Sequence, residues 1–214
     1  MIKRVSTGFI VLLVFMILGG CVSRPAPLQN DLVATADPQL YGNVVGQITT
    51  ISEDHRFGHK GEFFVSNFSD GRPFIFGEAK NMEHEPNIKR ISNEEGYINF
   101  AYPEGSFEIN SISTTNSDYP IRINFYVTPG EITNLGHIFL LFNPEQNNKY
   151  IIIIVDNQEH IKNYISTNYP EQANVFTGDY EVKSNSVFQL LKKEDLKSFV
   201  ENYYGKLPPE LANY

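Results

Sequence analysis

The fold is decided by the stretch Ile121-Arg-Ile-Asn-Phe-Tyr-Val127, the turn Thr128-Pro-Gly130 and the run Ile132-Thr-Asn-Leu-Gly-His-Ile-Phe-Leu-Leu-Phe142. Apolar and polar side chains alternate strictly in the first stretch, which is typical of a strand with one buried face. Pro129 presets φ and Gly130 accepts a positive φ, so the chain is expected to turn there. The second half of the long run is apolar on both faces, which indicates a central strand covered on both sides.

Further strand signals lie on both sides of this block. Residues 150–155 are continuously apolar and predict a second strand that is buried on both faces. The polar residues 81–93 carry charges of both signs and are expected to form a long loop. Shorter runs, rich in β-branched and aromatic residues, predict strands at 44–51, 61–65, 73–76 and 105–112.

Two helices are expected after the last strand. Asp156 can cap the first helix, with Glu159 three residues later completing a capping box, and this helix should end before Pro170. The second helix is expected over residues 194–204, where apolar residues recur at helical spacing and Gly205 suits the position just past the end. Each helix should therefore bury one apolar stripe.

The composition and the order of these elements define the fold class. The chain has 214 residues, of which 41% are hydrophobic and 20% charged, a balance typical of a globular protein. Strands followed by helices predict a mainly β (α+β) fold: an antiparallel β-sandwich over residues 41–155 with two C-terminal helices, in residues 156–214, packed on it. The net charge of −8 argues against a nucleic-acid partner, and a single cysteine excludes a disulfide framework within the chain.

The N-terminal residues have the pattern of a secretory signal peptide. Lys3 and Arg4 give a basic start, residues 9–18 form an uninterrupted apolar run, and two glycines precede Cys21. The alternative is a membrane-spanning helix, which needs about 20 apolar residues. The stretch counted from residue 8 to residue 22 has only 15. We therefore expect residues 1–20 to be removed as a signal peptide.

The four residues Leu18-Gly-Gly-Cys21 resemble the lipobox of bacterial lipoproteins. In that family the signal is cleaved before the cysteine, here between Gly20 and Cys21, and the cysteine becomes acylated. Two or more acyl chains anchor a protein stably, so the resemblance implies a lipid bilayer as the partner of acylated Cys21. An aspartate after the cysteine favours the inner membrane of Gram-negative bacteria, and Val22 stands there instead. The resemblance thus implies an outer-membrane protein that faces the periplasm.

Residues 21–40 are expected to comprise the lipidated cysteine and a flexible tether. Three prolines lie among small and polar residues between 22 and 40, and no helical or strand periodicity is present. A coil of this length spans roughly 25 Å and would let the folded body stand away from the bilayer. The alternative is that part of this segment packs on the domain as an extended arm.

A second resemblance covers about residues 100–170. Tyr102-Pro-Glu-Gly-Ser-Phe-Glu-Ile109 resembles the strand entry of small prealbumin-like, or carboxypeptidase-regulatory-like, β-sandwiches. Phe125-Tyr-Val-Thr-Pro-Gly-Glu-Ile-Thr-Asn-Leu-Gly-His-Ile138 is similar to a stretch of bacterial lipoproteins that carry such a domain, although Asn134 stands where relatives often have tyrosine. The shared motifs are a turn, a hairpin and a bulge glycine. The resemblance therefore implies a fold and a location, and it carries over no active site.

Signals for a metal site are weak. His55 and His59 lie four residues apart among acidic neighbours, and a loop could bring them to the acidic cluster around His84. Gly58 and Gly61 indicate a loop rather than a metal-binding helix, and no glutamate lies between the histidines as in H-E-x-x-H. We expect a solvated polar loop and no cofactor, with His55, His59 and His84 as the weak metal candidates.

Two other histidines and several tyrosines are candidates for structural or binding roles. His137 lies in a strand and is expected to be a structural, hydrogen-bonding histidine, whereas His160 is expected on the exposed face of the first helix. Tyrosine is enriched at interfaces, but partial burial in the sandwich is the favoured interpretation here. The tyrosines near loops or on outward-facing strand positions are Tyr41, Tyr97, Tyr102, Tyr119, Tyr126 and Tyr180.

These observations favour a non-enzymatic protein. The sequence contains no nucleophile-elbow motif, P-loop or dinucleotide fingerprint. We expect a membrane-anchored bacterial envelope lipoprotein that acts as a binding or structural module, with another envelope protein or a glycan as its partner. The alternative is a periplasmic hydrolase or metal-dependent enzyme that uses the loop of His55 and His59.

Overall fold

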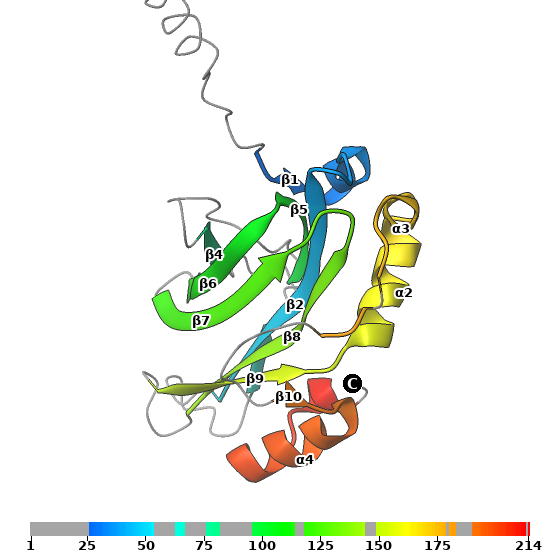
Figure 1. Ribbon diagram of the computed structural model, residues 1–214. Helices are drawn as coiled ribbons and strands as arrows, with labels where there is room; N and C mark the ends of the chain where they lie inside the picture. The colour runs from blue at the N-terminus through cyan, green and yellow to red at the C-terminus, as the bar shows by residue number, and fades with distance from the viewer. Residues whose placement is uncertain are drawn as a thin grey trace, which may run out of the picture.

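The computed structural model describes residues 26–53, 63–66, 76–81, 96–113, 118–143, 149–178, 180–182, 190–212 and 214. The described residues form strands, α-helices and two short 3-10 helices (Figure 1). The strands are β1 (Leu28–Gln29), β2 (Tyr41–Glu53), β3 (Phe63–Ser66), β4 (Phe76–Asn81), β5 (Tyr97–Pro103), β6 (Gly105–Ser113), β7 (Asp118–Val127), β8 (Ile132–Phe142), β9 (Tyr150–Val155) and β10 (Leu190–Leu191). The helices are η1 (Asn30–Thr35), α2 (Gln158–Asn168), α3 (Gln172–Val175), α4 (Lys193–Tyr204) and η2 (Pro209–Leu211).

The larger sheet is mixed. Its strand order is β1-β5-β2-β8-β9-β10, and β3 also pairs with the far part of β2. The β2–β8 and β9–β10 pairs are parallel, and the other pairs are antiparallel. The expectation of an antiparallel sheet is therefore wrong for its centre. Periodicity shows which faces of a strand are buried, but it does not show which distant strand becomes its neighbour.

The smaller sheet is antiparallel, with the order β4-β6-β7. Inward-facing residues of β6 and β7, including Phe107 and Phe125, share one hydrophobic cluster with residues of the larger sheet, including Ile138 and Leu140 of β8. Phe107 and Phe125 stack with ring centroids 5.5 Å apart. This cluster lies between the two sheets, where the alternation from Ile121 to Val127 placed one apolar face.

The opposite face of the larger sheet is covered by the C-terminal helices, as expected (Figure 1). Phe139 and Leu141 of β8 pack against α4, while α2 buries Ile161 and Ile165 against the first half of the sheet. The chain leaves α4 at Gly205, which has φ +73° as its position predicts. The first helix begins differently from the expectation: its N-cap is residue 157, and the carboxylate of residue 156 accepts the N–H of residue 158 at 3.1 Å.

A bulge in β8 decides which side chains face the helices. Residues 45 and 47 of β2 pair with residues 134 and 137 of β8, so β8 carries one extra residue here. Gly136 in the bulge has φ +79°, and its N–H donates to Oδ1 of Asn134 at 2.9 Å. As a result Leu135 and Ile138 both face the small sheet, whereas His137 turns toward the helices.

Residues 26–40 are folded onto the body and do not form a free tether. Leu28 and Gln29 pair with β5, and Val33 of η1 is completely buried in the cluster that also contains Ile161 of α2. The hydroxyl of Tyr41 donates to the carbonyl of Ala26 at 2.9 Å. The alternative of a packed arm is therefore correct for residues 26–40. The apolar side chain of Val33 is buried by long-range packing, which local periodicity does not predict.

Candidate functional site

His137 is the only histidine among the described residues that is fully buried, with 1% of its surface exposed. Its Nε2 lies 2.7 Å from Oγ1 of Thr49 on β2, and its Nδ1 lies 2.5 Å from the hydroxyl of Tyr214. The ring stacks on Phe139 with centroids 4.0 Å apart. Burial lowers the pKa of His137 well below its usual range, and the nearby His160 and Lys193 act in the same direction. The imidazole is therefore neutral, and His137 is hydrogen-bonded within a strand as expected.

Tyr214 connects this buried histidine to a pocket. Burial raises the pKa of the Tyr214 phenol above its usual range, so the hydroxyl stays neutral at physiological pH. Nζ of Lys193 lies 5.1 Å from the centroid of the Tyr214 ring, a distance that fits a cation–π contact. The end of the described chain is thus held between α4 and β8.

A second group of aromatic contacts joins α2 to β5. The hydroxyl of Tyr97 on β5 lies 2.8 Å from Nε2 of His160, and the Tyr97 ring stacks on Tyr164 with centroids 3.5 Å apart. His160 is exposed on α2, as the sequence predicts. Partial burial, followed by the charge of Lys193, lowers the pKa of His160. His137 of β8 and His160 of α2, 23 positions apart in the sequence, are therefore close enough for the charge of one to act on the other.

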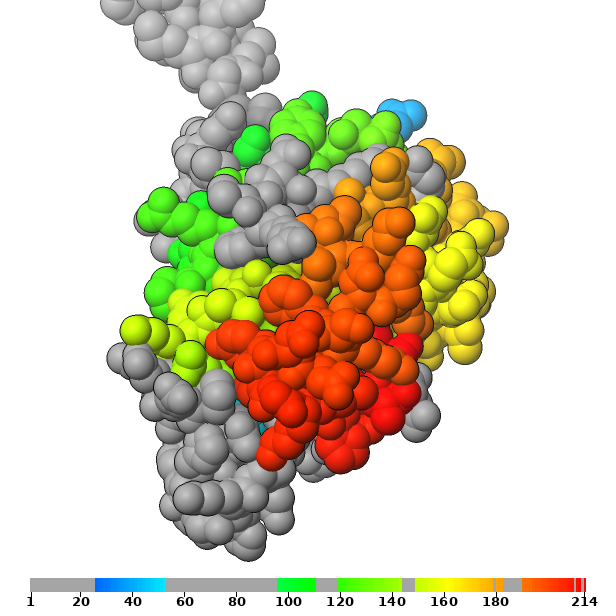
Figure 2. Space-filling model, turned by 90° about the horizontal axis from the view of Figure 1, so that it is seen from below, coloured from blue at the N-terminus to red at the C-terminus, as the bar shows by residue number. Residues whose placement is uncertain are grey.

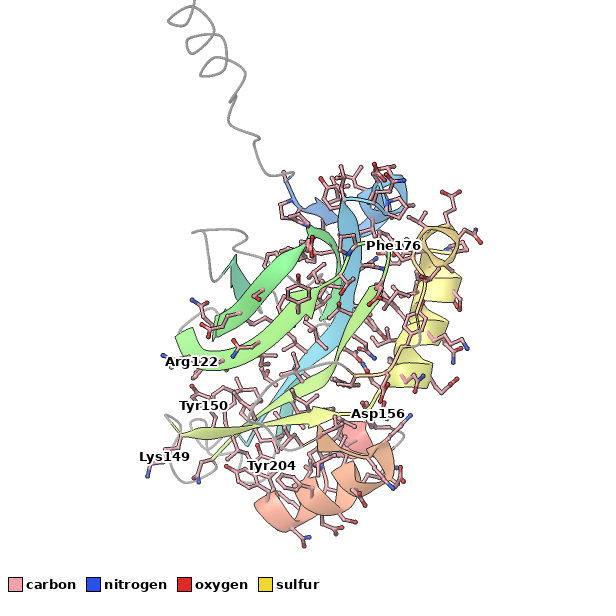
Figure 3. The ribbon with its side chains drawn as sticks, viewed as in Figure 1. Arg122, Lys149, Tyr150, Asp156, Phe176 and Tyr204 are labelled. Carbon is pink, nitrogen blue, oxygen red and sulfur yellow. The ribbon has the colours of Figure 1, made fainter. Side chains whose placement is uncertain are left out.

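The pocket has a volume of about 400 Å³ and lies between the first turns of α2 and α4. Figure 2 shows the face on which α4, in orange and red, lies beside α2, in yellow, and Figure 3 labels Asp156 where β9 meets α2. The lining residues are all polar or aromatic: Asp156, Asn157, Gln158, Glu159, His160, Lys192, Lys193, Glu194 and Tyr214. We call this hollow the α2–α4 pocket.

Polar atoms without partners lie in and beside the α2–α4 pocket. Asn157, which lines it, is 3% exposed, and its Nδ2 has no hydrogen-bond partner among the described residues. Its Oδ1 accepts from Nδ2 of Asn134 at 3.2 Å. Gln47, the neighbour of both Tyr97 and His137 in the sheet register, is 7% exposed, and within the described structure its Oε1 is also without a partner. A buried polar atom without a partner costs about 1–3 kcal/mol of stability, so a bound polar group that paired with Nδ2 of Asn157 would be favoured here.

A second hollow, of about 860 Å³, lies between β7 and β9. Its lining includes Ile121 and Arg122 of β7 and Tyr150 and Ile152 of β9, and Figure 3 labels Arg122 and Tyr150 across it. The hydroxyl of Tyr150 donates to the carbonyl of Pro120 and ties the two edges together. The lining also carries the polar and charged side chains of Glu108 and Asn110 on β6.

Most of the site candidates predicted from the sequence lie outside the described residues. These are Gly20, Cys21, His55, His59 and His84. Within the described ranges, no group of three or more histidine, cysteine, aspartate or glutamate residues is arranged to hold a metal ion.

The tyrosine candidates divide as the favoured interpretation predicts. Tyr102 is 1% exposed and Tyr41 is 9% exposed, whereas Tyr126 is 48% exposed and donates to Oε1 of Glu104 at 2.9 Å. Sequence reasoning missed the cluster around His137, because its members come from β2, β5, β8, α2 and the end of the chain. The available signal was the polar pair Gln47 and Thr49 on either side of the apolar Ile48.

Comparison with known proteins adds no relative. No known protein family, curated protein or solved structure matches the chain. Among the helices that the structure describes, none is long and apolar enough to cross a membrane.

Proposed function

We propose that this protein is a lipid-anchored binding module of the bacterial envelope, attached through acylated Cys21, and that the α2–α4 pocket is its ligand site. The lipobox-like residues Leu18 to Cys21 support the anchor, and Val22 after the cysteine supports the outer membrane. The two sheets with their shared core support a sandwich of the prealbumin-like kind, altered by the parallel β2–β8 pair.

The polar lining of the α2–α4 pocket is the observation that carries the ligand proposal. Ligand pockets commonly measure about 300–1,000 Å³ and are mostly apolar, whereas this one has a fitting volume and no aliphatic side chain in its lining. Carboxylates of Asp156, Glu159 and Glu194 accept hydrogen bonds, and Asn157 and the neighbouring lysines donate them. Such an alternation matches a hydroxyl-rich ligand, and we propose a unit of an envelope glycan.

His137 lies behind Tyr214 of the pocket lining, and its hydrogen bonds favour binding over proton transfer. Both ring nitrogens of His137 are engaged, one with Thr49 and one with Tyr214. A neutral imidazole has one donor and one acceptor nitrogen, so no lone pair is left to act as a base on a ligand. The raised pKa of the Tyr214 phenol likewise keeps that hydroxyl a hydrogen-bonding group.

Calorimetric titration of the mature protein with soluble cell-wall glycan fragments tests the ligand site. Glu194→Gln removes one pocket carboxylate, and we expect the Kd to rise about tenfold or more, because a hydrogen bond to a charged group contributes about 1.5–3 kcal/mol. Glu201→Gln, two turns further along α4 on its exposed side, is the matched control and should leave the Kd unchanged. Equal affinities for Glu194→Gln and wild type, or no binding of any fragment, would refute the glycan site.

Mass spectrometry of the protein extracted from membranes tests the anchor. We expect the mature N-terminal peptide to begin at Cys21 and to carry acyl chains, and density separation should place it with the outer membrane. Cys21→Ser should release the protein from the membrane fraction, because one or no acyl chain binds only marginally. An unmodified Cys21 in the membrane-bound protein would show that the anchor proposal is wrong.

A further inference from the structure

The folded arm changes the distance between the proposed lipid anchor and the body. Described structure begins at Ala26, whose carbonyl is bound by Tyr41, and β1 follows at once with Leu28 and Gln29 on the edge of β5. Five residue steps separate Cys21 from Ala26. An extended chain covers at most about 3.6 Å per residue, so this connection spans at most about 18 Å. A flexible tether that ran to residue 40 would reach much further.

The arm is attached firmly enough to keep the connection short. Val33 is completely buried, and Ala36 is 5% exposed in the same cluster. Nε2 of Gln172 on α3 donates to the carbonyl of Asn30 at 3.0 Å, which ties η1 to the helix layer. Because burial of an apolar side chain stabilises this attachment, residues 26–40 move with the body.

The short connection determines which end of the molecule lies near the bilayer. Figure 1 shows β1 and η1 at one end of the body, and α4 at the other. A headgroup layer is about 5–8 Å thick, so an anchor chain of at most about 18 Å brings the η1 end next to it. The α2–α4 pocket, lined by the first turns of α2 and α4, lies away from the η1 end of the body (Figure 1).

Two exposed leucines lie at the η1 end. Leu32 of η1 is 57% exposed, and Leu40, directly before β2, is 52% exposed. Single exposed leucines are ordinary on protein surfaces, but these two, one in η1 and one in the turn before β2, lie near the point where the anchor chain enters. Residues 26–43 contain two aspartates, Asp31 and Asp37, and no lysine or arginine. Contact with lipid would therefore come from apolar side chains and would be opposed by anionic headgroups.

We infer that the η1 end, with Leu32 and Leu40, is a second membrane contact that orients the body on a weakly charged lipid surface, with the α2–α4 pocket facing away from it. The inference rests on the proposed lipid anchor, since without acylated Cys21 nothing holds this end to a bilayer. The acyl chains supply the attachment, and the leucines select one orientation of the attached body.

Tryptophan fluorescence in reconstituted vesicles tests this orientation, because the natural chain contains no tryptophan. The acylated full-length mature protein is prepared as Leu32→Trp, Leu40→Trp and Leu190→Trp. Leu190, on β10 next to α4, is 54% exposed and is the matched control. In vesicles of phosphatidylcholine with brominated acyl chains, we expect the tryptophan emission of Leu32→Trp and Leu40→Trp to be blue-shifted and quenched. The emission of Leu190→Trp should show neither change.

Lipid composition gives a second readout. Replacing part of the phosphatidylcholine by phosphatidylglycerol should reduce the quenching of Leu32→Trp and Leu40→Trp, and added salt should restore it, because Asp31 and Asp37 repel the anionic surface. Quenching that is equal at positions 32, 40 and 190, or absent at 32 and 40 in vesicle-bound acylated protein, would overturn the orientation while leaving the anchor intact. Absence of acyl chains on Cys21 by mass spectrometry would instead refute the proposed function itself.

Discussion

Substituting Gly136 by alanine tests whether the bulge in β8 is an obligatory feature of the fold. Gly136 has φ +79°, and a Cβ atom there would lie 2.6 Å from Cγ2 of Ile154 and 3.1 Å from the carbonyl oxygen of Val155. Both neighbours belong to β9, which pairs with β8 and has little room to move. Alanine would therefore meet both an unfavourable backbone conformation and an overfilled core.

The expected loss of stability has two parts. A left-handed backbone conformation costs a non-glycine residue about 1–2 kcal/mol, and overpacking of a filled core typically costs about 1–3 kcal/mol. We therefore expect Gly136→Ala to lower the free energy of unfolding by about 2–5 kcal/mol. The matched control is Gly205→Ala, because Gly205 has φ +73° but a Cβ atom there meets nothing within 4 Å. This control should lose only the backbone part, about 1–2 kcal/mol.

Urea unfolding followed by circular dichroism measures both variants under the same conditions. The difference between Gly136→Ala and Gly205→Ala isolates the cost of the contact with β9, which we expect to be about 1–3 kcal/mol. Since the bulge also aims His137 at Tyr214, Gly136→Ala should further weaken glycan binding in the calorimetric assay, and Gly205→Ala should not. Equal losses of stability in the two variants would refute the reasoning, because backbone strain alone would then account for both.

Three further predictions concern the pH response, the α4 contact and the arm. Below about pH 6.5 the unfolded chain protonates its histidines, whereas native His137, with its lowered pKa, stays neutral. The free energy of unfolding should therefore fall by up to about 1.4 kcal/mol per pH unit between pH 6.5 and 5. Urea titrations at each pH should show a shallower fall for His137→Gln, and identical slopes for the two proteins would contradict the assignment. The hydroxyl of Tyr204 donates to the carbonyls of Ile51 and Phe142, both at 2.9 Å. Tyr204→Phe should therefore lower the free energy of unfolding by about 1–3 kcal/mol in thermal or urea unfolding, and a loss below about 0.5 kcal/mol would mean that other groups replace these bonds. Val33→Ala should lower the free energy of unfolding by about 1–3 kcal/mol and expose residues 26–40 to limited proteolysis. The neighbouring control Leu32→Ala should change it by less than about 0.5 kcal/mol, and equal effects of the two substitutions would show that η1 is not anchored through Val33.

The strand core was predictable because its signal is local. Alternation from Ile121 to Val127 and the doubly apolar run before Phe142 reflect side chains on opposite faces of one extended segment, and both elements form as expected. The helix that ends at Gly205 was predictable for the same reason, since an apolar stripe and a left-handed cap are properties of neighbouring residues.

The attachment of the arm was not predictable in this way. Residues 26–40 lack periodicity, and the arm is held by pairing of β1 with β5 and by the burial of Val33 in the cluster that contains Ile161 of α2. Both partners lie more than 60 positions away in the sequence. Composition alone favours a coil here, and only long-range contacts override that preference.

The buried faces of the strands and the two main helices follow from local sequence, because each depends on residues within about one turn or one strand of each other. The lipobox-like segment that ends at Cys21 stays a prediction from the sequence. Only the tertiary structure decided the parallel β2–β8 pair, the bulge at Gly136 that turns His137 toward the helices, and the α2–α4 pocket. The physical reason is that strand neighbours and pockets are selected by the packing of whole layers. No short segment carries that information, since its side chains pack equally well against more than one partner strand until the rest of the core is filled.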